Sequence, residues 1–249
     1  GMGVQRLTSR IHSLYQQVIS TETEKRDSQL KALQYQINPH FIYNTLGTIQ
    51  IMATLNHQKE IGACVYSLTR ILRETLVNTK QLIPLSKEIQ ILSYYIDIMQ
   101  TRYKNRLAVT FEIDNGFDDF LVPCQILQPI VENSIMHGLS HKLNLDQGDP
   151  QLKIEVRGHQ KGMVIRIYDN GIGMDPYRTL LVSETEKNAE NGQKTQSFQI
   201  GLNNIERRVK LFFGDSYGLE IQSEQNDFTA ISIVLPCTKE VPNAQSLVR

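Results

Sequence analysis

The 249-residue sequence has no tryptophan, only three cysteines and no excess of charge of either sign. The cysteines are far apart and odd in number, which argues against a disulfide framework or a Cys-x-x-Cys metal site and fits a reducing compartment. Lysine plus arginine equals aspartate plus glutamate at 26 each, so nothing predicts a nucleic-acid-binding surface. No apolar run approaches the roughly 20 residues that cross a bilayer, and no signal peptide opens the chain. With 40% hydrophobic residues, we expect a soluble globular protein of one large or two ordinary domains.

Apolar residues in the first sixty positions recur at helical spacing. They form two stripes that are out of register with each other: Val4, Leu7, Ile11, Leu14 and Val18, then Leu30, Leu33, Ile37, Phe41, Leu46, Ile49 and Ala53. The first stripe has the spacing of a coiled coil. The register break between the stripes predicts either a hinge or a solvated stretch of helix.

A second helix is predicted from Lys59 to Val77, after a turn at Asn56-His57. Two helices with a short connection form an antiparallel hairpin, whose exposed apolar seam needs another hairpin to cover it. We therefore expect residues 1–82 to contain a coiled coil and a helical hairpin. Two chains would then complete a homodimeric four-helix bundle.

Pro39 stands directly before His40 within this helical pattern. A proline inside a helix removes one backbone donor and crowds the preceding turn, so Pro39 predicts a kink beside an exposed imidazole. Alternatively, Pro39 ends one helix and His40 decorates the join. These residues alone do not decide between the two interpretations.

Strands and helices alternate from residue 83 to residue 240, before a tail at 241–249. Ser86 is expected to cap a helix from Lys87 to Tyr103. The further predicted helices are Pro123–Met136 and Leu202–Phe213, and the predicted strands are Leu107–Ile113, Leu152–Arg157, Val164–Tyr168, Leu219–Ser223 and Ala230–Leu235. Short turns between consecutive strands favour an α+β fold, with a mixed or largely antiparallel sheet covered by helices on one face.

Two groups of polar residues in this region are expected to face solvent. The first is the charged side of the helix from Lys87 and its end, with Glu88, Asp97, Arg102, Lys104 and Arg106. The second is the polar segment from Pro176 to Gln199, which is too long for an ordinary connection and predicts a disordered loop or a lid.

Three polar clusters in the second half suggest one shared ligand. Glu132-Asn133 offers an amide oxygen suited to a hydrated Mg²⁺. The stretch Asp169-Asn170-Gly171-Ile172-Gly173-Met174 offers a carboxylate for an exocyclic amine and glycines that let backbone approach a ring or phosphate. Gly201 precedes a predicted helix, where free backbone donors face an anion. Each cluster also has an ordinary explanation, as a helix cap, a β-turn or a helix-start glycine.

Together these segments resemble the N, G1 and G2 boxes of the ATP-binding fold that gyrase, Hsp90 chaperones, histidine kinases and MutL share. The matching segments are residues 127–138, 169–174 and 200–208, and residues 36–44 lie upstream of them. The whole resembles a sensor histidine kinase of the LytS/YesM type over residues 30–236. The implied fold is a Bergerat-type α/β sandwich after the helical hairpin, with domain limits at 1–82 and 83–240.

The resemblance implies a role for each matching position. His40 would accept the phosphoryl group, with Asn44 or Glu132 orienting or deprotonating its ring. Asn133 would hold Mg²⁺, and Asp169 would bind the adenine amino group. The other implied nucleotide-binding positions are His137, Gly171, Gly173, Gly201, Leu202, Asn204 and Arg207.

The sequence departs from the family pattern at three positions. Many histidine kinases have an acidic residue directly after the phosphoacceptor, whereas Phe41 stands here, as is usual for this subfamily. Met136 stands where relatives often have a lysine, which removes a phosphate contact. Gln199 replaces a glycine two residues before Gly201, which stiffens the expected lid hinge. We therefore expect activity with low intrinsic turnover.

The function that the resemblance implies is ATP- and Mg²⁺-dependent autophosphorylation of His40, followed by transfer to an aspartate of a response-regulator receiver domain. Two alternatives are a nucleotide-binding scaffold without phosphoryl transfer and an ATPase that uses Glu132 as general base. Gly1 before Met2 suggests that the natural chain extends further. We expect a cytoplasmic fragment of a bacterial sensor, with a membrane segment only in a missing N-terminal region.

Overall fold

A computed structural model describes residues 39–77, 81–145, 148–174 and 193–240, with only the backbone for 76–77 and 193–200. The chain divides into two compact units, residues 1–57 and 58–249, and each is described by itself. The predicted coiled coil, its register break and the tail at 241–249 lie outside the described residues. So does most of the predicted loop or lid, residues 176–192.

The described helix of the first unit is α2 (Pro39–Leu55). It ends at the predicted turn, where the Asn56 N–H donates to Met52 O at 3.1 Å and His57 has a φ of 55°. That left-handed conformation stops a helix, so the turn is confirmed. Residues before Pro39 lie outside the described part, and the kink stays a prediction.

The second unit begins with α3 (Lys59–Val77) and α4 (Leu85–Arg102), which pack against each other. The bounds of α3 are as predicted, but the prediction that Ser86 caps α4 is wrong. The helix begins at Leu85, two residues earlier than predicted, and the backbone N–H groups of Leu85 and Ser86 donate to the carbonyls of Phe120 and Asp118 at 2.8 and 3.0 Å. Because this neighbouring loop satisfies the first-turn donors, no side-chain cap is needed.

The unit boundary after His57 differs from the predicted domain limit at residue 82, which stays a prediction. The helical hairpin and the dimeric bundle also stay predictions, since α2 and α3 belong to different units.

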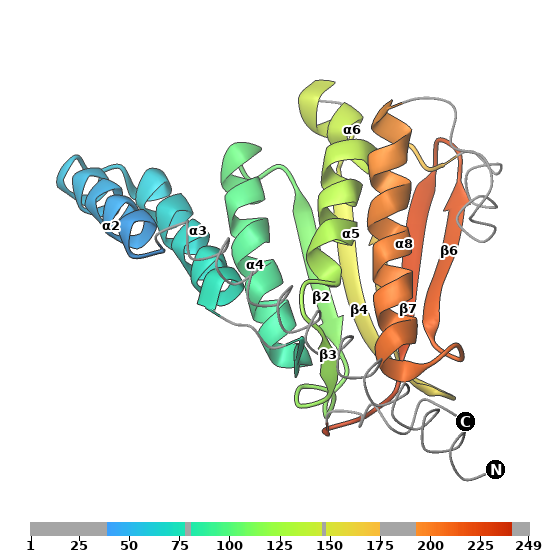
Figure 1. Ribbon diagram of the computed structural model, residues 1–249. Coiled ribbons are helices and arrows are strands. Elements are labelled where there is room, and N and C mark those ends of the chain that lie inside the picture. The colour runs from blue at the N-terminus through green and yellow to red at the C-terminus, as the bar shows by residue number, and fades with distance from the viewer. Residues whose placement is uncertain (1–38, 78–80, 146–147, 175–192, 241–249) are drawn as a thin grey trace, which may run out of the picture. The chain divides into compact units, whose positions relative to one another are not determined.

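A five-stranded mixed sheet lies at the centre of the second unit, in the order β2-β4-β5-β7-β6 (Figure 1). The strands are β2 (Ala108–Ile113), β4 (Gln151–His159), β5 (Gly162–Asp169), β6 (Gly218–Glu224) and β7 (Phe228–Leu235). β2 pairs with β4 in parallel, and the other neighbours are antiparallel. The predicted mixed sheet is confirmed. A separate pair, β1 (Leu82–Pro84) with β3 (Leu121–Pro123), was not predicted.

Helices cover one face of this sheet, as predicted: α4, α5 (Leu127–Asn133) and α8 (Gln193–Phe213) lie side by side in front of the strands (Figure 1). Buried and less buried residues alternate along β4 and β5, so Leu152, Ile154 and Val156 face the core. The other face of β4 carries charges. There, Lys153 pairs with Glu112 at 2.9 Å and Arg157 pairs with the same carboxylate at 2.6 Å.

Two predicted helix starts are wrong. The helix expected at Pro123 begins at Leu127, because Pro123 ends β3 and Gln125 has a φ of 58°. It continues beyond Asn133 as the π-helix η1 (Ser134–Gly138), which a short helix α6 (Ser140–Leu145) follows. The helix expected at Leu202 begins at Gln193 instead. Its first residues belong to the polar segment that was predicted to be a disordered loop or a lid.

The expectation that the charged residues around α4 face solvent holds only in part. Asp97, Arg102 and Lys104 are exposed. Glu88 is buried, with 2% of its surface exposed, and Arg106 donates to the carbonyls of Leu143 and Lys142 at 2.8 and 3.1 Å. Helical periodicity predicts which side of a helix a residue lies on. It does not predict whether a loop from elsewhere in the chain packs over that side and buries the residue.

Candidate functional site

His40 is exposed on the first turn of α2, one helical turn before Asn44. The amide nitrogen Nδ2 of Asn44 lies 3.3 Å from Nδ1 and 3.4 Å from Nε2 of the imidazole. This is the usual reach of side chains four residues apart on a helix. An amide in this place can donate a hydrogen bond to one ring nitrogen and so hold the ring while the other nitrogen reacts.

Asp169 is a buried carboxylate of the second unit, at the end of β5 with 1% exposure. It accepts hydrogen bonds from the Ser134 hydroxyl and from the Gly171 N–H, the latter at 3.0 Å. Burial raises the pKa of Asp169 to about 6, and these two hydrogen bonds and the charge of Lys142 oppose the rise. The carboxylate is therefore mainly ionised at neutral pH.

The end of η1 packs directly against the loop after Asp169. A Cβ atom on Gly138 would lie 2.6 Å from Oδ1 of Asp169, and one on Gly171 would lie 2.3 Å from the Gly138 carbonyl oxygen. The Ile172 N–H donates to that same carbonyl at 3.0 Å. Glycine is thus required at both positions by close approach of backbone and carboxylate.

The loop after Asp169 is also tied to the hairpin between β6 and β7. Gly173 has a φ of 63°, and a Cβ there would overlap the Glu224 carbonyl. The Asn226 N–H donates to Ile172 O at 2.6 Å, and the Met174 N–H donates to the Ser223 hydroxyl at 2.8 Å. The backbone of residues 171–174 is therefore fixed in one conformation beside Asp169.

Asn133, the last residue of α5, is half-buried and faces α8. A Cβ on Gly201 would lie 3.9 Å from Nδ2 of Asn133. The structure thus brings together the predicted Mg²⁺ ligand and the glycine of the third motif. However, Gly201 is the ninth residue of α8, so the prediction that it precedes a helix and offers free donors is wrong for this structure.

The other predicted site residues differ in how far they are exposed. Glu132, His137, Asn204 and Arg207 are exposed. Leu202 is fully buried, so only its backbone could reach a ligand. Glu132 is near the Tyr95 phenol of α4, whose pKa is raised mainly by burial and further by the charge of Glu132.

Three residues that sequence reasoning gave no role complete the site: Ser134, Gly138 and Lys142. Lys142 donates to the Asn170 carbonyl at 2.6 Å and places a positive charge near Asp169. The sequence signal for Ser134 and Gly138 was their place in the segment 127–138, after Asn133. Lys142 follows the motif and carries no signal of its own.

Comparisons with known proteins match two families to successive parts of the chain. Residues 28–107 match the family described as Histidine kinase, and residues 119–239 match the family of Histidine kinase-, DNA gyrase B-, and HSP90-like ATPases. The protein YwpD of Bacillus subtilis is 31% identical over 218 residues, which are 86% of this chain and 72% of that protein. This chain belongs to the histidine kinase family.

Sensor proteins are among the relatives of this histidine kinase. Sensor histidine kinase YesM of Bacillus subtilis is 35% identical over 94% of this chain, and Sensor protein LytS of Enterococcus faecalis is 27% identical over 88%. The chain spans 38% and 36% of their lengths. The catalytic domain of histidine kinase ThkA aligns with 65% of this chain at 16% identity and a TM-score of 0.46.

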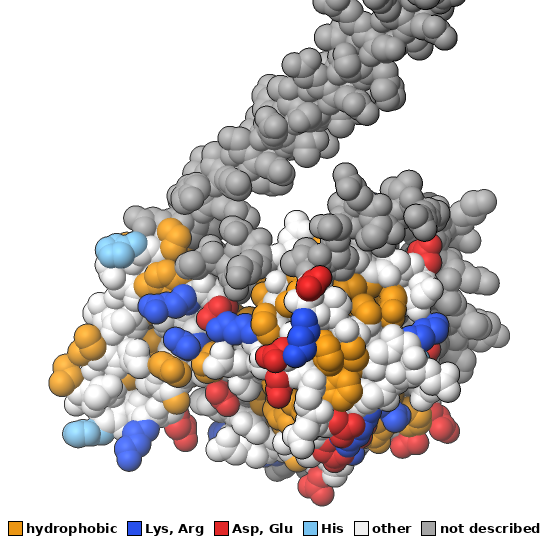
Figure 2. All heavy atoms as spheres, turned by 90° about the horizontal axis from the view of Figure 1, so that it is seen from below, with side chains coloured by type: hydrophobic (Ala, Val, Ile, Leu, Met, Phe, Trp, Pro, Cys, Tyr) orange, Lys and Arg blue, Asp and Glu red, His pale blue; other side chains and the backbone are white. Residues whose placement is uncertain are grey.

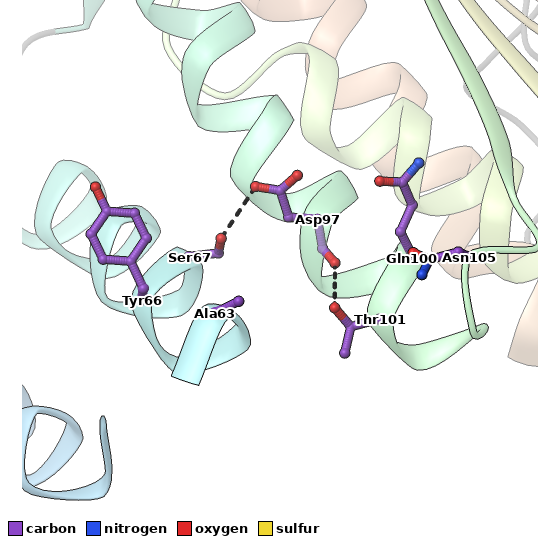
Figure 3. Close-up of a pocket in the computed structure, with 7 residues that line it drawn as sticks. All are labelled: Ala63, Tyr66, Ser67, Asp97, Gln100, Thr101 and Asn105. Carbon is purple, nitrogen blue, oxygen red and sulfur yellow. Dashed lines mark hydrogen bonds between the residues drawn. The ribbon is translucent and has the colours of Figure 1, made fainter. Parts of the chain in front are cut away.

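The pocket shown in Figure 3 lies outside the motifs of this kinase, between α3 and α4. It has a volume of about 310 Å³, and its lining residues are Ala63, Tyr66, Ser67, Asp97, Gln100, Thr101 and Asn105. The Ser67 hydroxyl donates to the Asp97 carboxylate at 3.3 Å across it. The pocket thus belongs to the packing of the two helices.

Charges of both signs lie on one face of the described chain. On the face shown in Figure 2, lysine and arginine side chains are interspersed with aspartate and glutamate. Among the described residues, no helix is long and apolar enough to cross a membrane.

Proposed function

We propose that this chain is an ATP-dependent protein-histidine kinase that phosphorylates its own His40 and passes the phosphoryl group to an aspartate of a response-regulator receiver domain. The observation that carries the proposal is the arrangement around Asp169. A buried carboxylate that is mainly ionised at neutral pH is held by both the N-box and the G1 segments, and Asn133 of the N box lies next to Gly201.

The residues of the second unit suit a bound nucleotide. Asp169 has its hydrogen-bond donors fixed on one side and can accept one more hydrogen bond, from the amino group of adenine. Gly171 and Gly173 have no side chains, so a bound nucleotide can approach the backbone closely at these two positions. Other nucleotide contacts proposed from the motifs are His137, the Leu202 backbone, Asn204 and Arg207.

Asn133 fits the proposed role of Mg²⁺ ligand, because its half-buried amide offers a neutral oxygen next to Gly201. When bound, Mg²⁺ neutralises charge on the phosphates and orients them.

His40 fits the role of phosphoacceptor because it is exposed and its ring has Asn44 beside it. A neutral imidazole is a competent nucleophile near pH 7. One ring nitrogen forms the bond to phosphorus while the bond between the γ-phosphorus and the ADP oxygen breaks, and the proton on the other nitrogen can leave to solvent. We propose that Asn44 orients the ring and that Glu132 is the candidate base.

The proposed assembly is a homodimer, and it is the cytoplasmic part of a membrane-anchored bacterial sensor. Large apolar side chains on α2 and α3 support the dimer, since Ile51, Leu55 and Ile61 are 62%, 74% and 50% exposed. The names of the relatives support the sensor assignment, together with the small share of their length that this chain spans.

Incubation with γ-labelled ATP tests the proposal. We expect an acid-labile, base-stable phosphoryl group on the wild-type chain and none on His40→Gln. The matched control is His57→Gln, in the exposed turn after α2, which should be labelled like wild type.

The same experiment separates the two alternative functions. ATP binding without incorporation would favour a scaffold. Steady phosphate release that Glu132→Ala abolishes would favour an ATPase.

A further inference from the structure

We propose that Glu88 is a positioning residue for the nucleotide site, because its buried carboxylate fixes the start of the helix that carries Asn133. Glu88 lies on the first turn of α4 and is 2% exposed. Its Oε2 accepts from the Gln125 N–H at 2.9 Å, and its Oε1 accepts from the Leu127 N–H at 3.0 Å. Each carboxylate oxygen therefore has a backbone donor from the segment that precedes or begins α5.

The start of α5 depends on this distant side chain. Its N-cap residue is Ile126, which has no side-chain oxygen, and no side-chain hydrogen bond of its own caps the helix. The first N–H groups of a helix need acceptors from elsewhere, and a negative charge is most favourable at that end. Glu88 supplies the acceptors at this end. Burial raises the pKa of its carboxyl, while the backbone donors of residues 125–127 and the charge of Arg208 favour the ionised form.

Arg208 of α8 holds the same segment from a second side. Its Nη2 donates to the Cys124 carbonyl at 2.6 Å, and its charge favours the ionised form of Glu88. Residues 124–127 are therefore held between α4 and α8, the two helices that flank α5 in Figure 1. Within this segment Gln125 has a φ of 58°, a conformation that side-chain-bearing residues adopt only when their surroundings impose it.

The position of α5 determines the geometry of the motifs further along the chain. From Leu127 the backbone runs without a break through Asn133 and η1 to Gly138. Ser134 donates to Asp169, and Gly138 packs against it. A shift of the helix start would therefore displace the Mg²⁺ ligand and the donor of Asp169 together.

The same segment has a link to α3. The side chain of Gln125 donates from Nε2 to the Thr75 hydroxyl at 3.0 Å, and Lys87, next to Glu88, pairs with Glu74 at 2.6 Å. A displacement of α3 against α4 would thus act on residues 124–127 directly. Gln125 and Lys87 therefore connect α3 with the segment that Glu88 holds.

The test uses the full chain with Glu88→Gln, which keeps the shape but removes the charge and one acceptor. Glu60→Gln, on the exposed first turn of α3, is the matched control. We expect affinity for a fluorescent ATP analogue to fall roughly tenfold in Glu88→Gln, within the range of typical site-to-site coupling, and to stay at the wild-type value in the control.

Amide hydrogen exchange distinguishes positioning from a general loss of stability. In Glu88→Gln, amides of residues 125–138 should exchange faster while those of β4, β5 and β7 keep their protection. Wild-type affinity in Glu88→Gln would overturn the proposal, and so would equal loss of protection across the sheet. If Glu88→Gln does not fold, Arg208→Gln should give the same local pattern with a smaller amplitude, and an unchanged pattern would overturn the proposal.

The inference rests on the proposed function, because it assumes that the site takes ATP. Binding by the wild-type chain is therefore measured first. Absence of wild-type binding would overturn both proposals, whereas wild-type binding that Glu88→Gln leaves unchanged would overturn only the role of Glu88.

Discussion

The helix that carries His40 and the loops that surround Asp169 differ in how they are stabilised. In α2 only Ala53 is buried, whereas Phe41 and Leu55 are 68% and 74% exposed. Around Asp169, backbone, carboxylate and hydroxyl groups are in direct contact, and Asp169, Ser134 and Gly171 are buried. The proposed nucleotide site is thus built from contacts within one unit, while the helix of the proposed phosphoacceptor His40 presents apolar surface that other molecules or segments can cover.

The largest effect that this comparison predicts comes from adding one methyl group at Gly171. In Gly171→Ala the Cβ would lie 2.3 Å from the Gly138 carbonyl oxygen, a backbone atom that cannot move alone. We expect nucleotide binding to be lost and unfolding to become easier by about 3 kcal/mol, the upper part of the usual cost of overpacking. Titration with an ATP analogue and thermal unfolding measure both effects.

The control for this substitution is Gly116→Ala, in a turn where the described residues leave the Cβ free of neighbours within 4 Å, although φ is 92°. It should cost stability through strain but leave nucleotide affinity unchanged. Wild-type affinity in Gly171→Ala would contradict the site geometry.

The next effect concerns the exposed face of α2. Leu55→Lys places a charge where we propose that a second chain packs, so the dimer should weaken by roughly 2 kcal/mol or more, as for a central interface residue. Sedimentation equilibrium measures the change, and nucleotide affinity should not change. Thr54→Lys, next to it on α2 and also exposed, serves as the control. If the dimers of both variants weaken equally, the cause is the added charge and not the position of Leu55.

Much of the fold could be predicted because it depends on local periodicity. The bounds of α3 and the positions of the five main strands follow from apolar spacing and turn residues. Prediction from the sequence failed where contacts with residues far along the chain determine the local structure. Pro123 belongs to β3 because it pairs with Leu82, and Glu88 is buried because residues 124–127 return to α4.

The candidate site shows the same limit. Motif order identified Asn133, Asp169, Gly171 and Gly201, because backbone approach and carboxylate chemistry require those residue types in that sequence. The contact between Ser134 and Asp169 joins residues 35 positions apart, and no spacing rule indicates it. The start of α8 was also missed, since helical backbone there continues through a polar stretch without an apolar face.

A smaller effect concerns the charge of Asp169. Its pKa is about 6 in the folded chain, so the carboxylate becomes protonated as the pH falls through 6 and can no longer accept freely from adenine. Nucleotide affinity should therefore drop below about pH 6. Ser134→Ala removes a hydrogen bond that favours the ionised form, and the drop should then begin about one pH unit higher.

Titration of nucleotide binding between pH 5 and pH 8 measures this shift, and the nucleotide's own ionisation cancels between the two proteins. An identical pH profile for both would show that Ser134 does not act on Asp169.

The free energy of unfolding should also depend on pH through the Asp169 carboxyl, and the direction of this dependence follows from its pKa. The folded chain binds the Asp169 proton more tightly than the unfolded chain, in which the usual value of 3.8 applies. Between these two values the folded state holds more protons, so this group's contribution makes stability fall as the pH rises from about 4 to about 6. Asp169→Asn should remove that slope, which urea titrations at several pH values can measure.

The smallest effect returns to α2, where the same kind of substitution as at Gly171 should have the opposite sign. Gly47 lies inside the helix, and the described residues place no atom within 4 Å of a Cβ built there. Alanine is favoured over glycine in a helix interior by about 1 kcal/mol. Gly47→Ala should therefore raise the helical stability of residues 39–55, seen as slower amide exchange in that range, and should leave ATP-analogue affinity unchanged. A destabilised Gly47→Ala helix would mean that another chain or segment packs closely against this position, and the contrast between an open α2 and a closed arrangement around Asp169 would then have to be abandoned.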